Sequence, residues 1–340
     1  MKKYLLPKNG SFYKANLHCH STFSDGGWTP EEIKENYKKR GYSVVAFTDH
    51  NVLLSHKELS DEGFLALNGV EININDDNYP DKYAKTCHLC MIAIDPDNLI
   101  HPCWHREKYL NKHTSEFRDL VKFDATKPDV ERVYNIDCVN SIIKMGRDAG
   151  FFVTYNHPTW SGESYDTYMN YEGMHAMEIC NYECVCIGHD EHNEKIYDAM
   201  LKSGKRIYCV ADDDNHNDRN RPNRDSAFGA FTMIKAEKLK YEMITEALVK
   251  GEFYATEGPL INELWYEDGK VYIEFSPARE AFITNANRSV SRVKDKNGEL
   301  ITKACFNVEN DDMFFRITVE GVDGKRAYTN AYFIDELTEI

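Results

Sequence analysis

Three segments of the sequence repeat one arrangement, in which a glycine precedes a β-prone apolar run and the run ends in side chains that can bind a metal ion. They are residues 41–50, 150–158 and 204–216. A glycine suits the left-handed position that follows a helix, and the uninterrupted Val, Ile and Phe runs suit strands that are buried on both faces. Helices that alternate with such strands predict an α/β fold built on a parallel sheet.

Seven strands are expected in the first two thirds of the chain, at residues 15–20, 44–50, 65–73, 86–94, 151–157, 176–181 and 207–211. Helices are expected between them. Thr29-Pro30-Glu31-Glu32 has the signature of a capped helix start, and apolar residues recur at helical spacing over residues 137–149 and 189–203. From this pattern alone, a barrel and an open sheet both remain possible.

The pattern changes after about residue 258. Asp268-Gly269, Asn297-Gly298 and Asp323-Gly324 each stand between β-prone segments, and such pairs are typical of hairpin turns. No helical run intervenes. We therefore expect a first domain of residues 1–258 and a small antiparallel β domain of residues 259–340.

Composition narrows the class of protein. The 340 residues include 41 basic and 56 acidic side chains, a net charge of −15, which argues against an extended nucleic-acid surface or an anionic-membrane surface. No apolar run approaches the roughly 18 residues of a membrane span, and no secretory signal is evident. The ten cysteines are then expected to be reduced and the protein cytoplasmic. Cys87 and Cys90 are expected to be buried thiols of a strand rather than zinc ligands.

Residues of the types that bind hard or borderline metal ions stand at or near nearly every expected strand end. His18 and His20 are two residues apart, which on a strand directs both side chains to one side. The others are Asp25, Asp49, His50, Glu71, His88, His157, Glu178, Asp213, Asp214 and His216. In a parallel α/β barrel these ends converge on one face, where so many imidazoles and carboxylates would carry a heavy desolvation and repulsion cost without a cation.

Some of these residue types have an ordinary interpretation. His101, His105 and His113 fall in the loop-like stretch 95–130 and are expected at the surface, with a lid as the alternative. Glu178 is expected to be a strand-end carboxylate rather than a ligand.

The motifs together resemble those of the PHP family, the polymerase-and-histidinol-phosphatase phosphoesterases. They are Leu-His-Cys-His-Ser-Thr-Phe-Ser-Asp-Gly at 17–26, Phe-Thr-Asp-His-Asn at 47–51, Gly-Val-Glu-Ile around Glu71, Asn-His-Pro around His157, and Asp-Asn-His at 214–216. The resemblance covers about residues 14 to 250. The tail, at 253–259 and 324–330, also resembles the β segment that follows this domain in one bacterial subgroup.

This resemblance implies a distorted, TIM-like (βα)7 barrel with two or three divalent ions of zinc, manganese or iron. By analogy, one ion would be held by His18, His20, Glu71 and Asp214, a second by Glu71, His88 and His157, and a third by Asp25, His50 and His216. Asp213 is a possible substitute for Asp214.

The activity expected from the resemblance and from the donor set is hydrolysis of a small phosphate ester or short nucleotide by a metal-bound hydroxide. Asp49 and Asp213 are candidate catalytic carboxylates. Arg224, which follows the last motif together with Arg219 and Arg221, is a candidate for binding the substrate phosphate, and a solvated basic loop is its alternative. Two other functions remain open: an amidohydrolase-like metal hydrolase, and a non-catalytic protein that binds a partner through its C-terminal β domain.

Overall fold

The computed structural model describes residues 2–80, 83–218, 226–309 and 311–338. Its strands are β1 (Lys3–Tyr4), β2 (Ser11–Asn16), β3 (Val44–Phe47), β4 (Leu65–Asn75), β5 (Thr86–Ala93), β6 (Phe151–Tyr155), β7 (Ala176–Asn181), β8 (Tyr208–Asp212), β9 (Phe231–Ala236), β10 (Phe253–Thr256), β11 (Ile261–Glu267), β12 (Lys270–Ala278), β13 (Glu280–Asn285), β14 (Ser291–Lys294), β15 (Ile301–Asn307), β16 (Phe314–Glu320), β17 (Arg326–Thr329) and β18 (Tyr332–Phe333).

The helices are α1 (Pro30–Lys39), α2 (Ile136–Asp148), α3 (Tyr165–Tyr168), α4 (Tyr182–Cys186), α5 (Glu194–Lys202), α6 (Tyr241–Lys250) and α7 (Ile334–Thr338), with short 3-10 helices at Lys57–Leu59 and Ser115–Leu120. The predicted capping box is confirmed: the Thr29 side chain accepts from the Glu32 backbone N–H, and the Glu32 side chain accepts from Thr29 N–H. Among the described helices, none has both the length and the apolar character that a membrane crossing requires.

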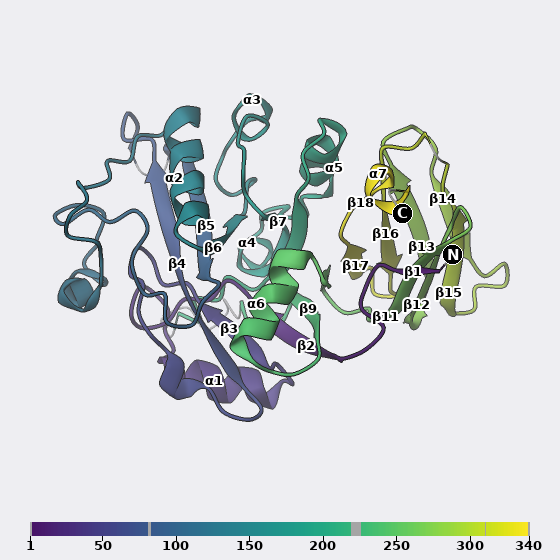
Figure 1. Cartoon of the computed structure of the whole chain (residues 1–340), viewed down its shortest axis with the longest axis horizontal. Coiled ribbons are helices and arrows are strands. Elements are labelled where there is room, and N and C mark those ends of the chain that lie inside the picture. Colours follow the sequence, from purple (N-terminus) through teal and green to yellow (C-terminus); the bar gives the residue numbers. More distant parts are fainter. Residues whose placement is uncertain (1, 81–82, 219–225, 310, 339–340) are drawn as a thin grey trace.

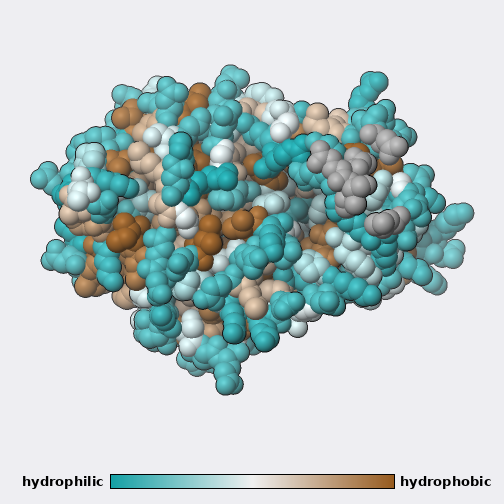
Figure 2. Space-filling view, in the orientation of Figure 1, coloured by the Kyte–Doolittle hydropathy of each residue, from teal (hydrophilic) through white to brown (hydrophobic). Residues whose placement is uncertain are grey.

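The strands form two sheets. One has the order β14-β13-β16-β17-β10-β9-β2-β3-β4-β5-β6-β7-β8, and the other has the order β1-β11-β12-β15. In Figure 1 the strands from β11 onward gather at one end of the molecule, with both chain ends beside them. Figure 2 shows that this face of the molecule is mainly hydrophilic, with apolar residues in smaller groups between.

All seven predicted strands are present, as β2 to β8, and the structure corrects two details. First, β2 ends at Asn16, so His18 and His20 follow the strand instead of belonging to it. Second, β5 runs antiparallel to both β4 and β6, although a parallel strand was expected. The connection from Asn75 to Thr86 is shorter than the dozen or more residues that a parallel crossover needs.

The strands β2 to β10 curl around a shared core. A single buried cluster takes residues from each of them, including Ala15 of β2, Val210 of β8 and Phe253 of β10, and α6 contributes Ile244 and Leu248. Strand β8 also contacts β9, β10 and β2, and Cys19 forms a parallel bridge with Asn215. The curl therefore brings the segments that follow β2 and β8 together at one end.

Hairpins are confirmed at two of the three predicted turns. Asp268-Gly269 connects β11 to β12, and Asp323-Gly324 connects β16 to β17, with both pairs antiparallel. The prediction is wrong at Asn297-Gly298, because β14 pairs with β13 in one sheet and β15 pairs with β12 in the other. A second apolar core lies between these two sheets. The first strand of the chain, β1, pairs with β11.

A buried ion pair joins α5 to β16. The Arg316 side chain is 1% exposed, and its Nε and Nη2 donate to the two carboxylate oxygens of Asp198 at 2.6 and 3.0 Å. We expect Arg316→Met to lower the free energy of unfolding by about 2–3 kcal/mol, because it leaves a partly buried carboxylate without its partner. Urea unfolding measures the effect.

Arg206 provides a matched control, because it pairs with Asp335 and Glu336 of α7 but is 46% exposed. Arg206→Met is expected to change stability by less than about 0.5 kcal/mol. Equal losses in the two variants would show that burial of the Arg316 pair does not matter.

Candidate metal centre

Nine of the predicted site residues meet at one end of the curled sheet, under and around a cavity of about 700 Å³. They come from the segments after β2, β3, β6 and β8, from the interior of β4 and from the beginning of β5. These residues are His18, His20, Asp25, His50, Glu71, His88, His157, Asp214 and His216. Because β5 is antiparallel, His88 stands near its amino end and pairs with Asn73 of β4.

The innermost group consists of His18, His20 and Asp214, whose ligand-type atoms lie within 4.8 Å of one another. The Nε2 atoms of His18 and His20 are 3.1 and 3.0 Å from Asp214 Oδ1. Glu71 completes the group, with Oε1 3.2 Å from His18 Nε2 and Oε2 3.5 Å from His20 Nε2. The four residues predicted to hold the first ion thus lie together.

Glu71 also faces a second pair of histidines. Its Oε1 lies 3.0 Å from His88 Nδ1 and 3.3 Å from His157 Nε2. This carboxylate is fully buried. Because it contacts histidines of both groups, it lies between the first group and the second.

The third group lies nearer the mouth of the cavity. Asp25, His50, His216 and His20 have ligand-type atoms within 4.8 Å of one another. His50 Nε2 is 3.6 Å from Asp25 Oδ2, and His216 Nε2 is 3.5 Å from Asp25 Oδ1. The Asp25 side chain is 35% exposed, so this group is open to solvent from one side.

The donor set fits divalent cations. Two buried carboxylate oxygens, Glu71 Oε2 and Asp214 Oδ1, receive no well-aligned hydrogen bond from the described residues, although buried acceptors are normally satisfied. Imidazole nitrogens nevertheless lie close to both, His50 Nδ1 at 2.9 Å from Glu71 Oε2 and His20 Nε2 at 3.0 Å from Asp214 Oδ1.

The Nε2 atoms of His18 and His20 are 3.1 Å apart, so their lone pairs converge on the same space. Imidazole and carboxylate ligands suit zinc, manganese or iron. The Cys90 thiol also lies within 4.8 Å of ligand atoms of His18 and Glu71, but burial raises its pKa to about 12, so it is not a thiolate in the metal-free protein.

Without cations, protons neutralise part of this carboxylate charge. Burial opposes the protonated form of His50, but Asp25 and Glu71 outweigh burial and raise the pKa of His50 to about 9. Burial is likewise outweighed at His216, where Asp25 and Asp214 raise the pKa to about 10. At His20 burial prevails, together with the neighbouring His50 and His216, and the pKa falls to about 4.

Glu178 supports the centre in a way that the sequence analysis did not anticipate. It lies inside β7 and is fully buried. Its Oε1 is 2.7 Å from His18 Nδ1, and its Oε2 accepts hydrogen bonds from His157 N and Asn181 Nδ2 at 2.7 and 2.9 Å. The sequence signal for this role was a carboxylate, Glu178, between the apolar residues of the expected strand 176–181.

The two candidate catalytic aspartates do not line the cavity. Asp49 accepts hydrogen bonds from Ser21 N, Ser21 Oγ and Ser24 Oγ. Asp213 accepts from the backbone of residues 228–230 and from the Tyr37 hydroxyl, and burial raises its pKa to about 6. Both carboxylates therefore hold loops in place, and Asp213 does not take the position of Asp214.

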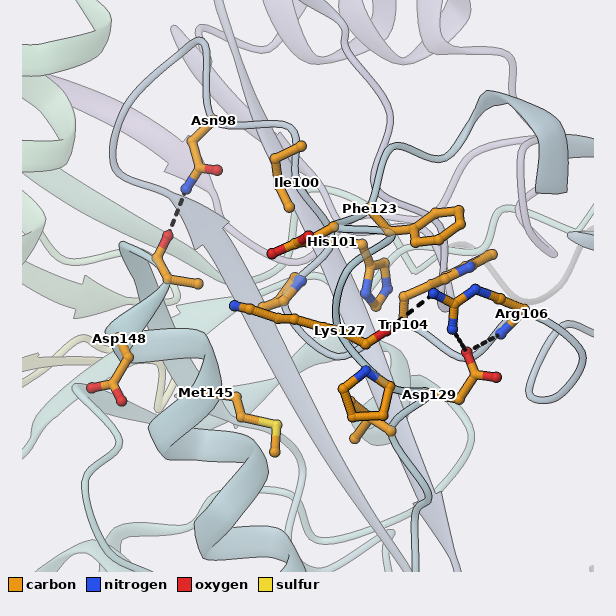
Figure 3. Close-up of a pocket in the computed structure, with 15 residues that line it drawn as sticks. Asn98, Ile100, His101, Trp104, Arg106, Phe123, Lys127, Asp129, Met145 and Asp148 are labelled. Atoms are coloured by element: carbon orange, nitrogen blue, oxygen red, sulfur yellow. Dashed lines mark hydrogen bonds and ion pairs between the residues drawn. The ribbon is translucent and has the colours of Figure 1, made fainter.

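Arg219, Arg221 and Arg224 lie outside the described residues. The surface prediction holds for His113, which is exposed, and is wrong for His101 and His105, which are 3% and 5% exposed. The long segment folds back on the sheet and covers them. Figure 3 shows His101 with Trp104 and Phe123 in the wall of a second cavity, of about 500 Å³, beside α2.

Trp160 forms an aromatic wall of the metal-centre cavity. Its ring lies 5.4 Å from the His88 ring and 4.9 Å from the His157 ring, edge to face in both cases. The buried Glu191 carboxylate accepts hydrogen bonds from the backbone N–H groups of Thr159 and Trp160 at 3.0 and 2.7 Å. The indole is therefore held in place while remaining 39% exposed.

Residues 16–180 match the family model described as the PHP domain. This match agrees with the family that the motifs indicated.

Two curated relatives match shorter stretches. A 5'-3' exoribonuclease of Haemophilus influenzae is 36% identical over 66 residues, and a phosphoribosyl 1,2-cyclic phosphate 1,2-diphosphodiesterase of Eggerthella lenta is 37% identical over 65 residues. Each match covers 18% of this chain, and 24% and 25% of the respective relatives. The chain thus spans about a quarter of the length of these relatives.

Solved structures are similar at low identity. A two-domain protein from Bacteroides vulgatus, described as containing a predicted PHP-like metal-dependent phosphoesterase, is 16% identical with a TM-score of 0.45, covering 97% of this chain and 98% of its own. An amidohydrolase from Chromobacterium violaceum is 18% identical with a TM-score of 0.39, covering 59% of this chain and 87% of its own.

We expect the purified protein to bind two or three divalent transition-metal ions per chain. His20→Ala and His157→Ala remove one donor each from different groups, so each variant is expected to lose about one ion per chain. Elemental analysis after dialysis in metal-replete buffer measures the content.

His192→Ala is the matched control, because His192 pairs with Glu257 at 3.1 Å and does not line the cavity. It is expected to keep the wild-type content. Less than one ion per chain in folded wild-type protein would contradict the metal centre.

Proposed function

We propose that this chain is a metal-dependent phosphoesterase that hydrolyses a small phosphate ester or a short nucleotide. The observation that carries the proposal is the convergence of nine histidine, aspartate and glutamate side chains beneath an open cavity, with two buried carboxylate oxygens that receive no well-aligned hydrogen bond from the described residues. The PHP domain match supports the same class of reaction.

The three groups of residues would each hold one ion. His18, His20, Glu71 and Asp214 would hold the first, Glu71, His88 and His157 the second, and Asp25, His50 and His216 the third. Bound divalent ions supply Lewis acidity, which activates water and stabilises the charge of a phosphate under attack. The protein's own contribution is to hold the donors in fixed positions: Glu178 orients His18, and Ser161 Oγ lies 3.2 Å from His157 Nδ1.

The rest of the cavity wall would receive the substrate. Asn75, Thr86 and Asn111 line it with polar groups, while Trp160 provides an apolar surface. No lysine or arginine is among the described residues that line the cavity. Phosphate charge would therefore be met by the ions and by neutral donors, and a contribution from Arg224 remains part of the proposal.

The size of the cavity supports a small substrate. About 700 Å³ lies within the usual range for small-molecule sites. The two curated relatives are named for cleavage of phosphodiesters in RNA and in a cyclic phosphate, which supports a phosphate ester as substrate.

The test is a phosphate-release screen of protein loaded with zinc, manganese or iron against sugar phosphates, mononucleotides and dinucleotides. For dinucleotides, product separation replaces phosphate release. We expect turnover of at least one ester and its loss after chelation. His157→Ala is expected to lower kcat/KM by ~10³-fold or more, because it removes a donor of the second ion.

The His192→Ala variant again serves as control and is expected to keep wild-type kcat/KM. Absence of turnover on every ester, in protein shown to hold two or more ions, would refute the proposed function but would leave the proposed metal binding in place.

A further inference from the structure

A buried arginine lies behind the metal centre. Arg132 lies near the end of the long segment between β5 and α2 and is 6% exposed. Its Nη1 donates to Asn51 Oδ1 and, at 3.0 Å, to the Asn73 carbonyl, and its Nη2 lies 3.4 Å from the Cys103 carbonyl. No aspartate or glutamate among the described residues forms an ion pair with it.

A buried guanidinium without a carboxylate partner is expensive unless its N–H groups are used. Here three neutral oxygens accept from it, and the Tyr109 ring lies 4.4 Å from its Cζ. The Tyr109 hydroxyl also accepts from Arg132 N at 2.7 Å. The segment between β5 and α2 thus holds the positively charged Arg132 side chain directly behind the proposed metal ligands.

The hydrogen bonds of Arg132 determine how the neighbouring amides face. A guanidinium only donates, so Asn51 must present its Oδ1 to Arg132. The Asn51 Nδ2 group then faces Asn73 Oδ1, at 3.1 Å. Asn51 also has a positive φ of 60°, a conformation that costs energy and is held by surrounding contacts.

The Asn73 amide, oriented by Asn51, contacts the rings of His50 and His88. Asn73 Oδ1 lies 3.1 Å from His50 Nδ1, a nitrogen that Glu71 Oε2 also approaches, at 2.9 Å. Asn73 Nδ2 lies 3.0 Å from His88 Nε2. Consequently His50 directs Nε2 toward Asp25, at 3.6 Å, and His88 directs Nδ1 toward Glu71, at 3.0 Å. A reversed Asn73 amide would place its NH₂ group against Asn51 Nδ2 and lose that bond.

We propose that Arg132 is a positioning residue of the metal centre, which fixes the rings of His50 and His88 through the amides of Asn51 and Asn73. This inference rests on the metal centre of the proposed function. Partners that orient metal ligands typically contribute 10–100-fold in metal affinity. Arg132 does not line the metal-centre cavity, so its effect would reach the centre through the two amides.

The experiment measures the affinity of metal-free protein for Zn²⁺ and for Mn²⁺ by competition with a chromophoric chelator. Arg132→Met and Arg132→Lys are compared with wild type and with Arg316→Met, which removes another buried guanidinium far from the centre. We expect Arg132→Met to weaken at least one ion by 10–100-fold. Arg132→Lys is expected to weaken it too, because one ammonium group cannot reach all three oxygens. Arg316→Met should lose stability but keep wild-type affinity.

A double-variant test separates positioning from general support of the fold. Asn73→Leu breaks the connection to both rings and is expected to reproduce the loss of affinity. The double variant Arg132→Lys with Asn73→Leu should then bind metal no more weakly than Asn73→Leu alone, because both changes interrupt the same chain of hydrogen bonds. Exogenous guanidinium at millimolar concentration should restore affinity to Arg132→Ala, whereas ammonium should not.

Wild-type affinity in folded Arg132→Lys, or additive losses in the double variant, would overturn the inference. If Arg132→Met fails to fold, the lysine variant and the Asn73 pair still decide the matter. Failure of the wild type to bind any ion would instead refute the metal centre and the proposed function together.

Discussion

The structure depends on one electrostatic constraint, the gathering of six imidazoles and three carboxylates in a small, largely buried volume. Several imidazole nitrogens lie close to 3 Å from a carboxylate oxygen, and this much buried carboxylate charge needs positive charge beside it. In the metal-free chain neighbouring carboxylates raise the pKa values of four histidines, which favours their protonated forms: His18, His50, His157 and His216. Cations would replace those protons in the same positions.

The fold supplies this gathering through the direction of its strands. Parallel strands bring their carboxyl ends to one edge, which accounts for the donors after β2, β3, β6 and β8. The reversed strand β5 adds a donor from its amino end, because its partner β4 runs the other way. One antiparallel strand thus lets His88 reach the same edge as His157, and both histidines contact Glu71.

Much of this arrangement could be predicted from the sequence, because strands, helix caps and ligand residue types leave local signals. The apolar run of β5 did not show its direction, since a run of buried residues looks the same in either direction, and the short connection from Asn75 to Thr86 was the available signal. The turn at Asn297-Gly298 has the expected local chemistry, but its strands pair with different sheets. The burial of His101 and the role of Arg132 depend on how a long irregular segment packs, and asparagine at position 73 carries no signal of its own.

The parallel bridge between Cys19 and Asn215 has a consequence for how the protein is made. The buried hydrogen bond beside it joins Asn16 and Asn215, which are 199 positions apart. The ligands near the start of the chain can therefore reach their final positions only after the segment around Asn215 has been synthesised. Contacts between such distant residues slow folding. We therefore expect the metal ligands to come together late, after most of the curled sheet has been synthesised.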